Sequence, residues 1–372
     1  MVSNKIIIYL VIILMIIPGI SIPHIDSGSK KINLSEKDNS LLIPNSISGA
    51  IIGSNQIGVL SQTKSLNVML TLPFNNQSEL STFLSSIQNK HSIFYHKFLT
   101  APEFDKLFSP SSVEYSKYID YFQRSGFSVK SYSDRVSIGL KGTASLFDSI
   151  FDTKLVKFHS KNETYFAPDS QLQLSVNYGA ISSIVGLNNM IRPSISPMFS
   201  GSNSSEVLYG SDLQQAYQLK QLYGQYGYPT NETIATILWS GQDSCGNSVA
   251  PYVPSNLYYY FDHNLPSNEP RPTVYGYPIL GAPVPGSSAS SDQTSANIES
   301  TLDLEMVGST APGAKIVEVY GPSATLSDVD QAFAAILNPS YNSTVDRALS
   351  KVVAISNSWG TSDTNDTTWM QY

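Results

Sequence analysis

Strand-like and helix-like segments alternate along residues 207–372, and this alternation restricts the possible fold more than any other feature of the chain. Neighbouring parallel strands need a crossover connection, usually a helix, whereas antiparallel strands can be joined by a short turn. The alternation therefore predicts a parallel sheet wound on both faces, with functional groups at the carboxyl ends of its strands. We expect strands over 233–239, 314–320 and 351–356 and one near Thr273, helices over 212–223, 295–313 and 327–337, and otherwise loop over 251–286.

The helix expected over residues 295–313 carries the most informative polar pattern. Ser295 is a suitable N-cap, and Pro312-Gly313 is a stop signal. Glu299 and Asp303 lie four residues apart, so their carboxylates project from one face of the helix. This spacing fits a solvated helix face as well as a catalytic pair, in which one carboxylate is a general base and the other orients it. The apolar side of the helix is expected to be the stripe formed by Ile298, Leu302, Met306 and Val307.

Residues 61–190 have the mixed pattern of an α+β domain, in which helices cover one sheet. Thr100 and Glu103 form a capping box, and Ser111 opens a second helix that Gly126 ends. We expect strands over 65–72, 127–132, 136–140 and 154–159, and helices over 78–86, 100–108, 111–126 and 143–151. The Pro- and Ser-rich residues 191–206 predict a linker with a candidate processing site, and residues 24–60 predict a loosely ordered lead-in segment.

Residues 1–23 have the composition of a secretory signal. Lys5 supplies the positive charge, and residues 6–17 are an unbroken apolar run. The run is short for a membrane span, and an uncleaved amino-terminal anchor is the alternative. We therefore expect an extracellular protein, either released or retained at the membrane by this segment. Cys245 is the only cysteine, so the chain has no internal disulfide.

The two halves of the chain differ in net charge. Residues 207–372 hold 5 Lys and Arg against 15 Asp and Glu, a net of −10, whereas residues 24–206 hold 16 against 14, a net of +2. Opposite signs favour docking of the first region on the second, and acid is expected to weaken that attraction. With 14% charged residues and a pI of about 5.2, the chain has no basic footprint for nucleic acid.

Several motifs occur in a definite order along the chain, at 95–104, 184–189, 209–217, 299–305, 311–316 and 358–360. Their order and combination resemble the sedolisin family of serine-carboxyl peptidases, which includes kumamolisin. The resemblance implies an α/β chain. Residues 61–190 would be an α+β ferredoxin-like activation (propeptide) domain. Residues 207–372 would be the first half of a subtilisin-like, doubly wound parallel-sheet peptidase domain.

The resemblance also implies roles for individual residues. Glu299 matches the general base, and Asp303 matches the acid that is hydrogen-bonded behind it. A free carboxylate has a pKa of about 4, so it can accept a serine proton in acid, where an imidazole is already charged. The strand edge on which the family lays its substrate peptide is matched by Ser358, Trp359 and Gly360. Trp359 also fits a purely structural place in the core.

Other parts of the family's site have no match here. The nucleophilic serine of the family lies in a Gly-Thr-Ser-containing segment far downstream, so we expect the chain to end before it and to be inactive alone. Gly360-Thr361-Ser362 belongs to a strand end and is not expected to be that nucleophile. The family's calcium site is likewise expected beyond this chain, and no metal ligand is assigned.

The sequence thus predicts an exported precursor of a serine-type endopeptidase that hydrolyses proteins and peptides at acid pH through an acyl-enzyme. Its own propeptide is expected to dock on the peptidase domain. The main alternative is a non-enzymatic secreted inhibitor or surface-binding module that retains the propeptide-like domain. A membrane-anchored adhesin is the other alternative.

Overall fold

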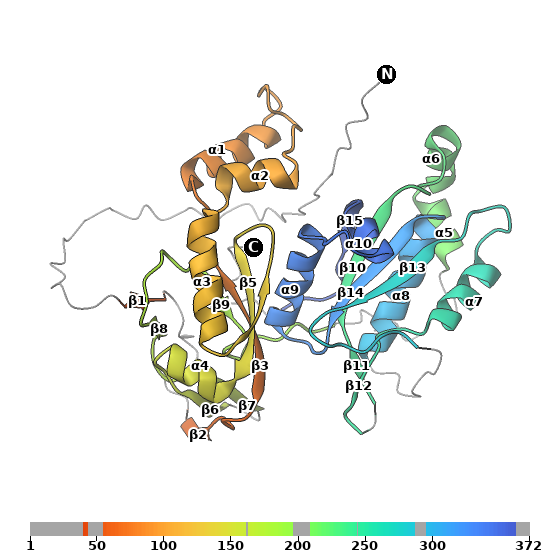
Figure 1. The fold of residues 1–372 in the computed structure, drawn as a ribbon. Coiled ribbons are helices and arrows are strands. Elements are labelled where there is room, and N and C mark those ends of the chain that lie inside the picture. Colours follow the sequence, from red (N-terminus) through yellow and green to blue (C-terminus); the bar gives the residue numbers. More distant parts are fainter. Residues whose placement is uncertain are drawn as a thin grey trace.

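The computed structural model describes residues 40–43, 55–160, 163–195, 209–243, 245–286 and 295–361. Two domains lie side by side in Figure 1, the first coloured orange to yellow-green and the second green to blue. The predicted signal at 1–23, much of the lead-in segment and residues 196–206 of the linker lie outside the described residues. Within these described ranges, every helix falls short of the length and apolar character that a membrane span needs.

A four-stranded antiparallel sheet, in the order β4-β5-β3-β9, is the centre of the first domain. β3 (Ser65–Thr71) pairs with β5 (Ser137–Thr143) along its whole length, and β4 (Ser128–Ser131) and β9 (Ser183–Val185) flank this pair. Alternate residues of a strand face opposite sides of a sheet. Val68 and Leu70 therefore enter the core of the first domain, whereas Met69 contacts the second domain.

Two helices cover the inner face of this sheet. α3 (Ser112–Arg124) begins after the predicted cap Ser111, whose hydroxyl accepts a hydrogen bond from the Glu114 amide at 3.1 Å. α4 (Ala144–Ile150) follows β5 directly. Their aromatic side chains fill the core, among them Tyr118, Phe122, Phe147 and Phe151.

Two further helices, α1 (Gln77–Gln88) and α2 (Ala101–Phe108), form a lobe beside the end of α3 in Figure 1. The predicted capping box opens α2, since the Glu103 carboxylate accepts from the Thr100 amide at 2.8 Å.

The prediction that the first domain has one sheet is wrong. β2 (Asn55–Val59), β6 (Leu155–Ser160) and β7 (Glu163–Pro168) form a separate three-stranded antiparallel sheet. β1 (Leu41–Leu42) pairs with β8 (Gln173–Leu174). β1 and β2 come from the expected lead-in segment. The segment shows no hydrophobic periodicity from which the two strands could be predicted, and they form only by pairing with distant strands.

The second domain is built on a four-stranded parallel sheet, as predicted, in the order β13-β14-β10-β15. β10 (Thr233–Trp239) is the first strand of this sheet in sequence, yet it lies between β14 (Lys315–Gly321) and β15 (Val352–Ser356). β13 (Thr273–Pro278) pairs with β14 on its other side. A short hairpin, β11 (Gly241–Gln242) with β12 (Ser248–Val249), follows β10 at the carboxyl edge.

Helices cover both faces of the parallel sheet. Val317 and Val319 of β14 face α9 (Leu326–Leu337) and α10 (Thr344–Leu349), whereas Ile316 faces α7 (Pro254–Asn264) and α8 (Ser295–Thr310). This is the three-layered arrangement expected of a doubly wound sheet.

Two predictions for the second domain are wrong. Residues 212–223 do not form one helix, because Gln218 has a left-handed φ of 56° and separates α5 (Gly210–Ala216) from α6 (Leu219–Tyr226). Residues 251–286 contain α7 in addition to β13. Consecutive tyrosines conceal the helical period of α7, whose Leu257 and Phe261 are fully buried.

Helix α9 is packed between the two domains. One side of it covers the parallel sheet, and the other lies against the β3–β5 sheet of the first domain (Figure 1). At Gly139 of β5 the helix comes so close that an added Cβ would lie 2.6 Å from Oε1 of Gln331. The apolar part of this contact joins Leu326 and Ala334 of α9 to Met69, Tyr132 and Val185.

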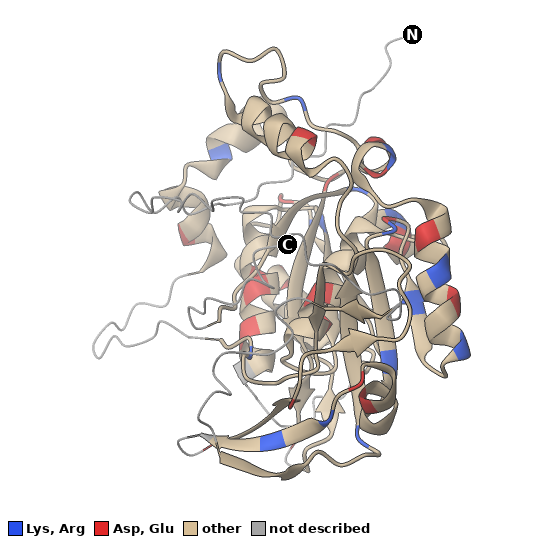
Figure 2. Ribbon diagram, turned by 90° about the vertical axis from the view of Figure 1, so that its left-hand side faces the viewer, with Lys and Arg blue, Asp and Glu red and all other residues tan. Residues whose placement is uncertain are grey.

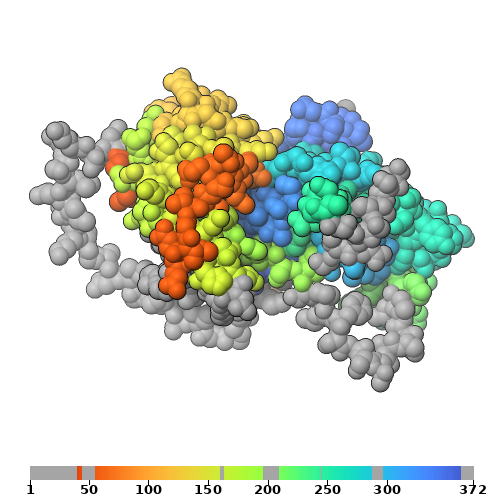
Figure 3. Space-filling view, turned by 90° about the horizontal axis from the view of Figure 1, so that it is seen from below, coloured from red at the N-terminus to blue at the C-terminus, as the bar shows by residue number. Residues whose placement is uncertain are grey.

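Hydrogen bonds extend the contact beyond its apolar part. The Asn338 Oδ1 atom accepts from the Ser133 hydroxyl and from the Asp134 amide, both at 2.7 Å. In the space-filling view of Figure 3, the blue atoms of the second domain lie directly against the yellow atoms of the first. The first domain is thus docked on the second through one face of its sheet.

No ion pair crosses this interface among the described residues, and the expected attraction between the net charges of the two regions stays a prediction. Among the described residues the only ion pair joins Arg271 and Asp262, both in the second domain. Figure 2 shows charges of both signs interspersed along the first domain. Asp330 lies one turn from Leu326 and from Ala334, and burial raises the pKa of its carboxyl well above the usual range. A protonated carboxyl is easier to bury than an ionised one, so the protonated form is favoured at this position, and the weakening of docking by acid stays a prediction.

Candidate active site

Helix α8 carries Glu299 and Asp303, but its buried face is not the predicted apolar stripe. Ile298 is 55% exposed and Leu302 is 37% exposed, whereas Ser300 and Leu304 are fully buried. An α-helix turns by about 100° per residue, so side chains two positions apart point to nearly opposite sides. Apolar residues occur all round this helix, and their spacing therefore does not decide which side is buried.

Asp303 is connected to the end of β15 through Ser358. The Ser358 hydroxyl donates to Asp303 Oδ1 at 2.5 Å, in a largely buried position. Burial raises the pKa of Asp303 to about 6; the Ser358 hydrogen bond opposes this rise, and the nearby Glu299 adds to it. Glu299 is half-buried one turn earlier on the same side of α8. The fold thus brings together Asp303 and Ser358, which are 55 positions apart in the chain.

The segment Ser358-Trp359-Gly360 follows β15 at the carboxyl edge of the sheet. Gly360 forms an isolated antiparallel bridge with Ser194 of the linker. The Ser194 amide donates to the Gly360 carbonyl at 2.8 Å, and the Gly360 amide donates to the Ser194 carbonyl at 3.0 Å. The chain's own linker therefore lies along the segment that was predicted to hold substrate.

Trp359 has a structural role in addition to any role in binding. It is half-buried and packs against the core between the parallel sheet and α9. The place in the core that the sequence also allowed for Trp359 therefore accounts for the buried part of this side chain.

A buried carboxyl that sequence reasoning missed lies beneath α8. Glu318 of β14 is fully buried; its Oε2 accepts from the Thr236 hydroxyl at 2.5 Å and its Oε1 from the Ser300 hydroxyl at 2.8 Å. Thr236 and Glu318 are direct partners in the β10–β14 register. Burial raises the pKa of Glu318 to about 7, while both hydroxyls oppose the rise. The available signal was a lone Glu inside an apolar central strand, where an acid is rare.

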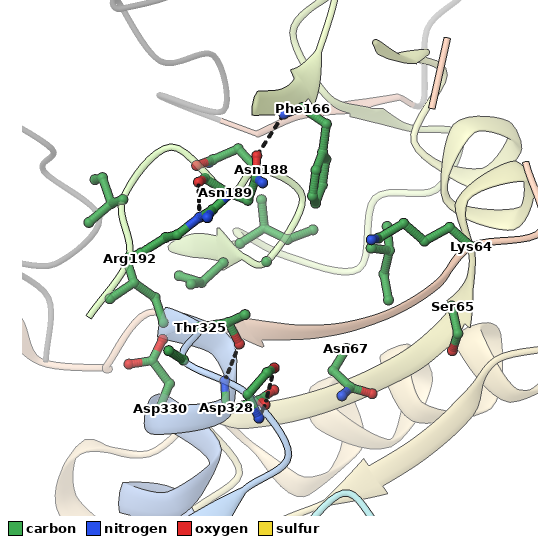
Figure 4. A pocket seen from close by; sticks show the side chains of 18 of the residues that line it. Lys64, Ser65, Asn67, Phe166, Asn188, Asn189, Arg192, Thr325, Asp328 and Asp330 are labelled. Atoms are coloured by element: carbon green, nitrogen blue, oxygen red, sulfur yellow. Dashed lines mark hydrogen bonds between the residues drawn. The ribbon is translucent and has the colours of Figure 1, made fainter. Parts of the chain in front are cut away.

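The cavity between the domains does not include this site. It has a volume of about 560 Å³, and Figure 4 shows Lys64 and Asn67 of the first domain facing Asp328 of α9 across it. Asp328 accepts from the Ser323 amide at 3.0 Å and hydroxyl at 2.8 Å, which ties it to its own loop. The cavity is a gap in the domain interface, and Glu299 and Asp303 do not line it.

No metal centre is present among the residues that the structure describes. No group of three or more His, Cys, Asp or Glu side chains there could hold a metal ion. No catalytic step is assigned to calcium, and a calcium site in the complete protein stays a prediction. His263, expected in a loop, lies in the last turn of α7 and stacks on Tyr259 with ring centroids 3.9 Å apart.

Comparison with known proteins identifies the first domain. Residues 53–190 match the family described as "Pro-kumamolisin, activation domain". The match covers the first domain. The match begins at β2, in agreement with the pairing of β2 and β6 in the activation domain. The resemblance to kumamolisin-like sedolisin precursors that the sequence motifs suggested is thereby confirmed in this domain.

One relative of known name supports the same conclusion. Xanthomonalisin from Xanthomonas sp. (strain T-22) is 27% identical over 127 residues. These residues make up 34% of the present chain but 15% of that relative, so the matched stretch spans a small part of the relative's length.

Proposed function

We propose that the protein is the exported precursor of a serine-carboxyl endopeptidase that hydrolyses proteins in acid. In this proposal Glu299 is the general base that accepts the proton of a serine nucleophile, and Asp303 orients Glu299. The sheet order, in which the first strand lies between the third and the fourth, is compatible with a subtilisin-like peptidase domain. The activation domain docked on α9 is the arrangement expected of a precursor.

The observation that carries the proposal is the position of the linker. Residues 194 and 360 exchange both backbone hydrogen bonds, as an added strand does on an exposed sheet edge. The neighbouring Ser358 side chain contacts Asp303 of the carboxylate pair. An extended peptide therefore lies within reach of the candidate catalytic groups, which is the relation that a peptidase needs between its substrate and its base.

The buried carboxyls support operation in acid. The pKa values of Asp303, Glu305 and Glu318 are raised to about 6, about 7 and about 7, in each case mainly by burial. A carboxyl whose pKa is raised in the folded state binds its proton more tightly there than in the unfolded chain. Its contribution is therefore most favourable at low pH and is lost as pH rises toward the folded pKa. At these three positions acid favours the folded state, in contrast to carboxylates that are paired with cations.

The proposal is tested by hydrolysis of an unfolded protein substrate by the full-length gene product at pH 4 and pH 8. We expect cleavage at pH 4, where a carboxylate base is still partly ionised whereas an imidazole is charged. We expect little cleavage at pH 8, where Asp303 and Glu318 have lost the protons that favour the fold. New peptide amino termini, quantified by mass spectrometry, are the readout. Hydrolysis that increases from pH 4 to pH 8 would contradict the proposal and point to an imidazole base.

The Gly360 edge gives a separate prediction. Gly360→Pro removes the amide that donates to Ser194, whereas Gly360→Ala keeps it, and an added Cβ meets no heavy atom within 4 Å. We expect the Ser194 amide to exchange with deuterium roughly fivefold faster in Gly360→Pro, since a hydrogen bond contributes about 1 kcal/mol. Gly360→Ala should exchange like the unmodified protein. Equal exchange in all three would show that the linker is not held by this edge.

A further inference from the structure

The rotation of α8 about its own axis needs an explanation that its apolar residues do not supply. If the apolar stripe determined the packing, Ile298 and Leu302 would face the sheet, and Ser300 would face solvent. The structure has the opposite arrangement, with Ser300 fully buried and Ile298 55% exposed. Turning the helix by about half a revolution would bury the stripe but would carry Asp303 away from Ser358. Leu304 and Val307 lie on the buried side as well, so either rotation buries apolar residues, and the polar contacts distinguish between the two.

Two such contacts join α8 to the sheet. Ser358 donates to Asp303 at 2.5 Å at the exposed end of the site, and Ser300 donates to Glu318 at 2.8 Å inside the core. Glu318 is itself fixed from the other side, since Thr236 donates to its second oxygen at 2.5 Å. A fully buried carboxyl that lost one of these donors would be left unsatisfied, so this arrangement disfavours any other rotation of the helix.

We propose that Glu318 is a positioning residue for the Glu299–Asp303 pair: through the Ser300 hydroxyl it fixes the rotation of α8 that brings Asp303 onto Ser358. Glu318 does not touch substrate in this account, and it acts through the helix. The proposal rests on the proposed function only in regarding Glu299 and Asp303 as a catalytic pair. The contacts themselves are independent of any activity.

The state of Glu318 agrees with this role. Burial raises its pKa to about 7, and the charge of Asp303 contributes in the same direction. Below about pH 7 Glu318 is therefore mainly a neutral carboxylic acid, which accepts from Ser300 and adds no negative charge near Asp303. Gln has the same shape and keeps an acceptor for Ser300 and a polar partner for Thr236, whereas Leu keeps neither.

The test measures the Asp303–Ser358 contact in the complete chain. The titration midpoint of Asp303 is followed by NMR of carboxyl-¹³C aspartate, with Asp303→Asn used for assignment. Ser358→Ala should raise this midpoint by roughly one pH unit, because the hydrogen bond from Ser358 favours the ionised form. The size of this increase in the Asp303 midpoint shows whether the hydrogen bond between Ser358 and Asp303 is formed.

We expect the Ser358→Ala effect to persist with Glu318→Gln and to fall by more than half with Glu318→Leu. The matched control is Glu305→Gln, which removes a half-buried carboxyl from α8 itself and should leave the effect intact. An undiminished effect in a folded Glu318→Leu variant would overturn the proposal. If Glu318→Leu does not fold, Ser300→Ala replaces it, because this variant removes only the hydroxyl that donates to Glu318. The Ser358→Ala effect on the Asp303 midpoint should then fall by more than half in Ser300→Ala, and an undiminished effect would overturn the proposal. No hydrolysis is measured, so the outcome is separate from that of the peptidase proposal.

Discussion

Ala334→Asp is expected to separate the activation domain from the second domain. Ala334 is 4% exposed and lies in the apolar contact with Met69, Tyr132 and Val185. An aspartate there would place an unpaired charge in this contact, beside the already buried Asp330. A buried charge without a partner costs on the order of 3 kcal/mol or more, which corresponds to more than about a hundredfold shift of the docking equilibrium.

Small-angle X-ray scattering measures the separation directly. The radius of gyration should increase in Ala334→Asp, while circular dichroism shows that both domains remain folded. Leu337→Asp is the control, since Leu337 is on the same helix but is 51% exposed. An unchanged radius of gyration for Ala334→Asp would mean that the contact on α9 does not hold the domains together.

The second large effect is a decrease in the stability of the second domain when the pH is raised from acid to neutral. The pKa of Glu318 rises from 4.5 to about 7 on folding, so the folded state retains a proton that the unfolded chain releases. The contribution of Glu318 is therefore fully favourable below pH 4.5, and it declines by about 3 kcal/mol as pH rises to 7. Asp303 and Glu305 act in the same direction.

Urea unfolding followed by tryptophan fluorescence between pH 4.5 and pH 8 checks this expectation. The three tryptophans, at 239, 359 and 369, all lie in the carboxyl-terminal half, so the signal reports that half alone. Glu318→Gln does not titrate and should flatten the decline, whereas Glu305→Gln, at a half-buried site, should flatten it less. A second domain that is more stable at pH 8 than at pH 5 would show that these carboxyls are not buried as described.

Local signals in the sequence were sufficient for much of the fold. The caps at Thr100 and Ser111 predicted two helix starts, because a cap depends on residues within one turn. β10 was predicted residue for residue from its apolar run between turn signals. The pairing of Glu299 with Asp303 follows from helical spacing alone.

The features that the sequence did not predict depend on distant partners. β1 and β2 form only against β8 and β6, more than 90 residues away. The buried side of α8 includes Ser300 and Asp303, whose partners are Glu318 of β14 and Ser358 after β15. For the same reason the proximity of Ser194 to Gly360 could not be inferred, because linker residues have no periodicity that records their partner.

Hydrolysis of an unfolded protein at pH 4 by the full-length gene product carrying Glu299→Gln tests the carboxylate mechanism most directly. Gln has the same size but cannot accept the serine proton, so we expect the rate to fall by at least about a hundredfold. Glu305→Gln, six positions along α8, should hydrolyse the substrate at nearly the unmodified rate. A Glu299→Gln protein that is as active as the unmodified one at pH 4 would contradict the account.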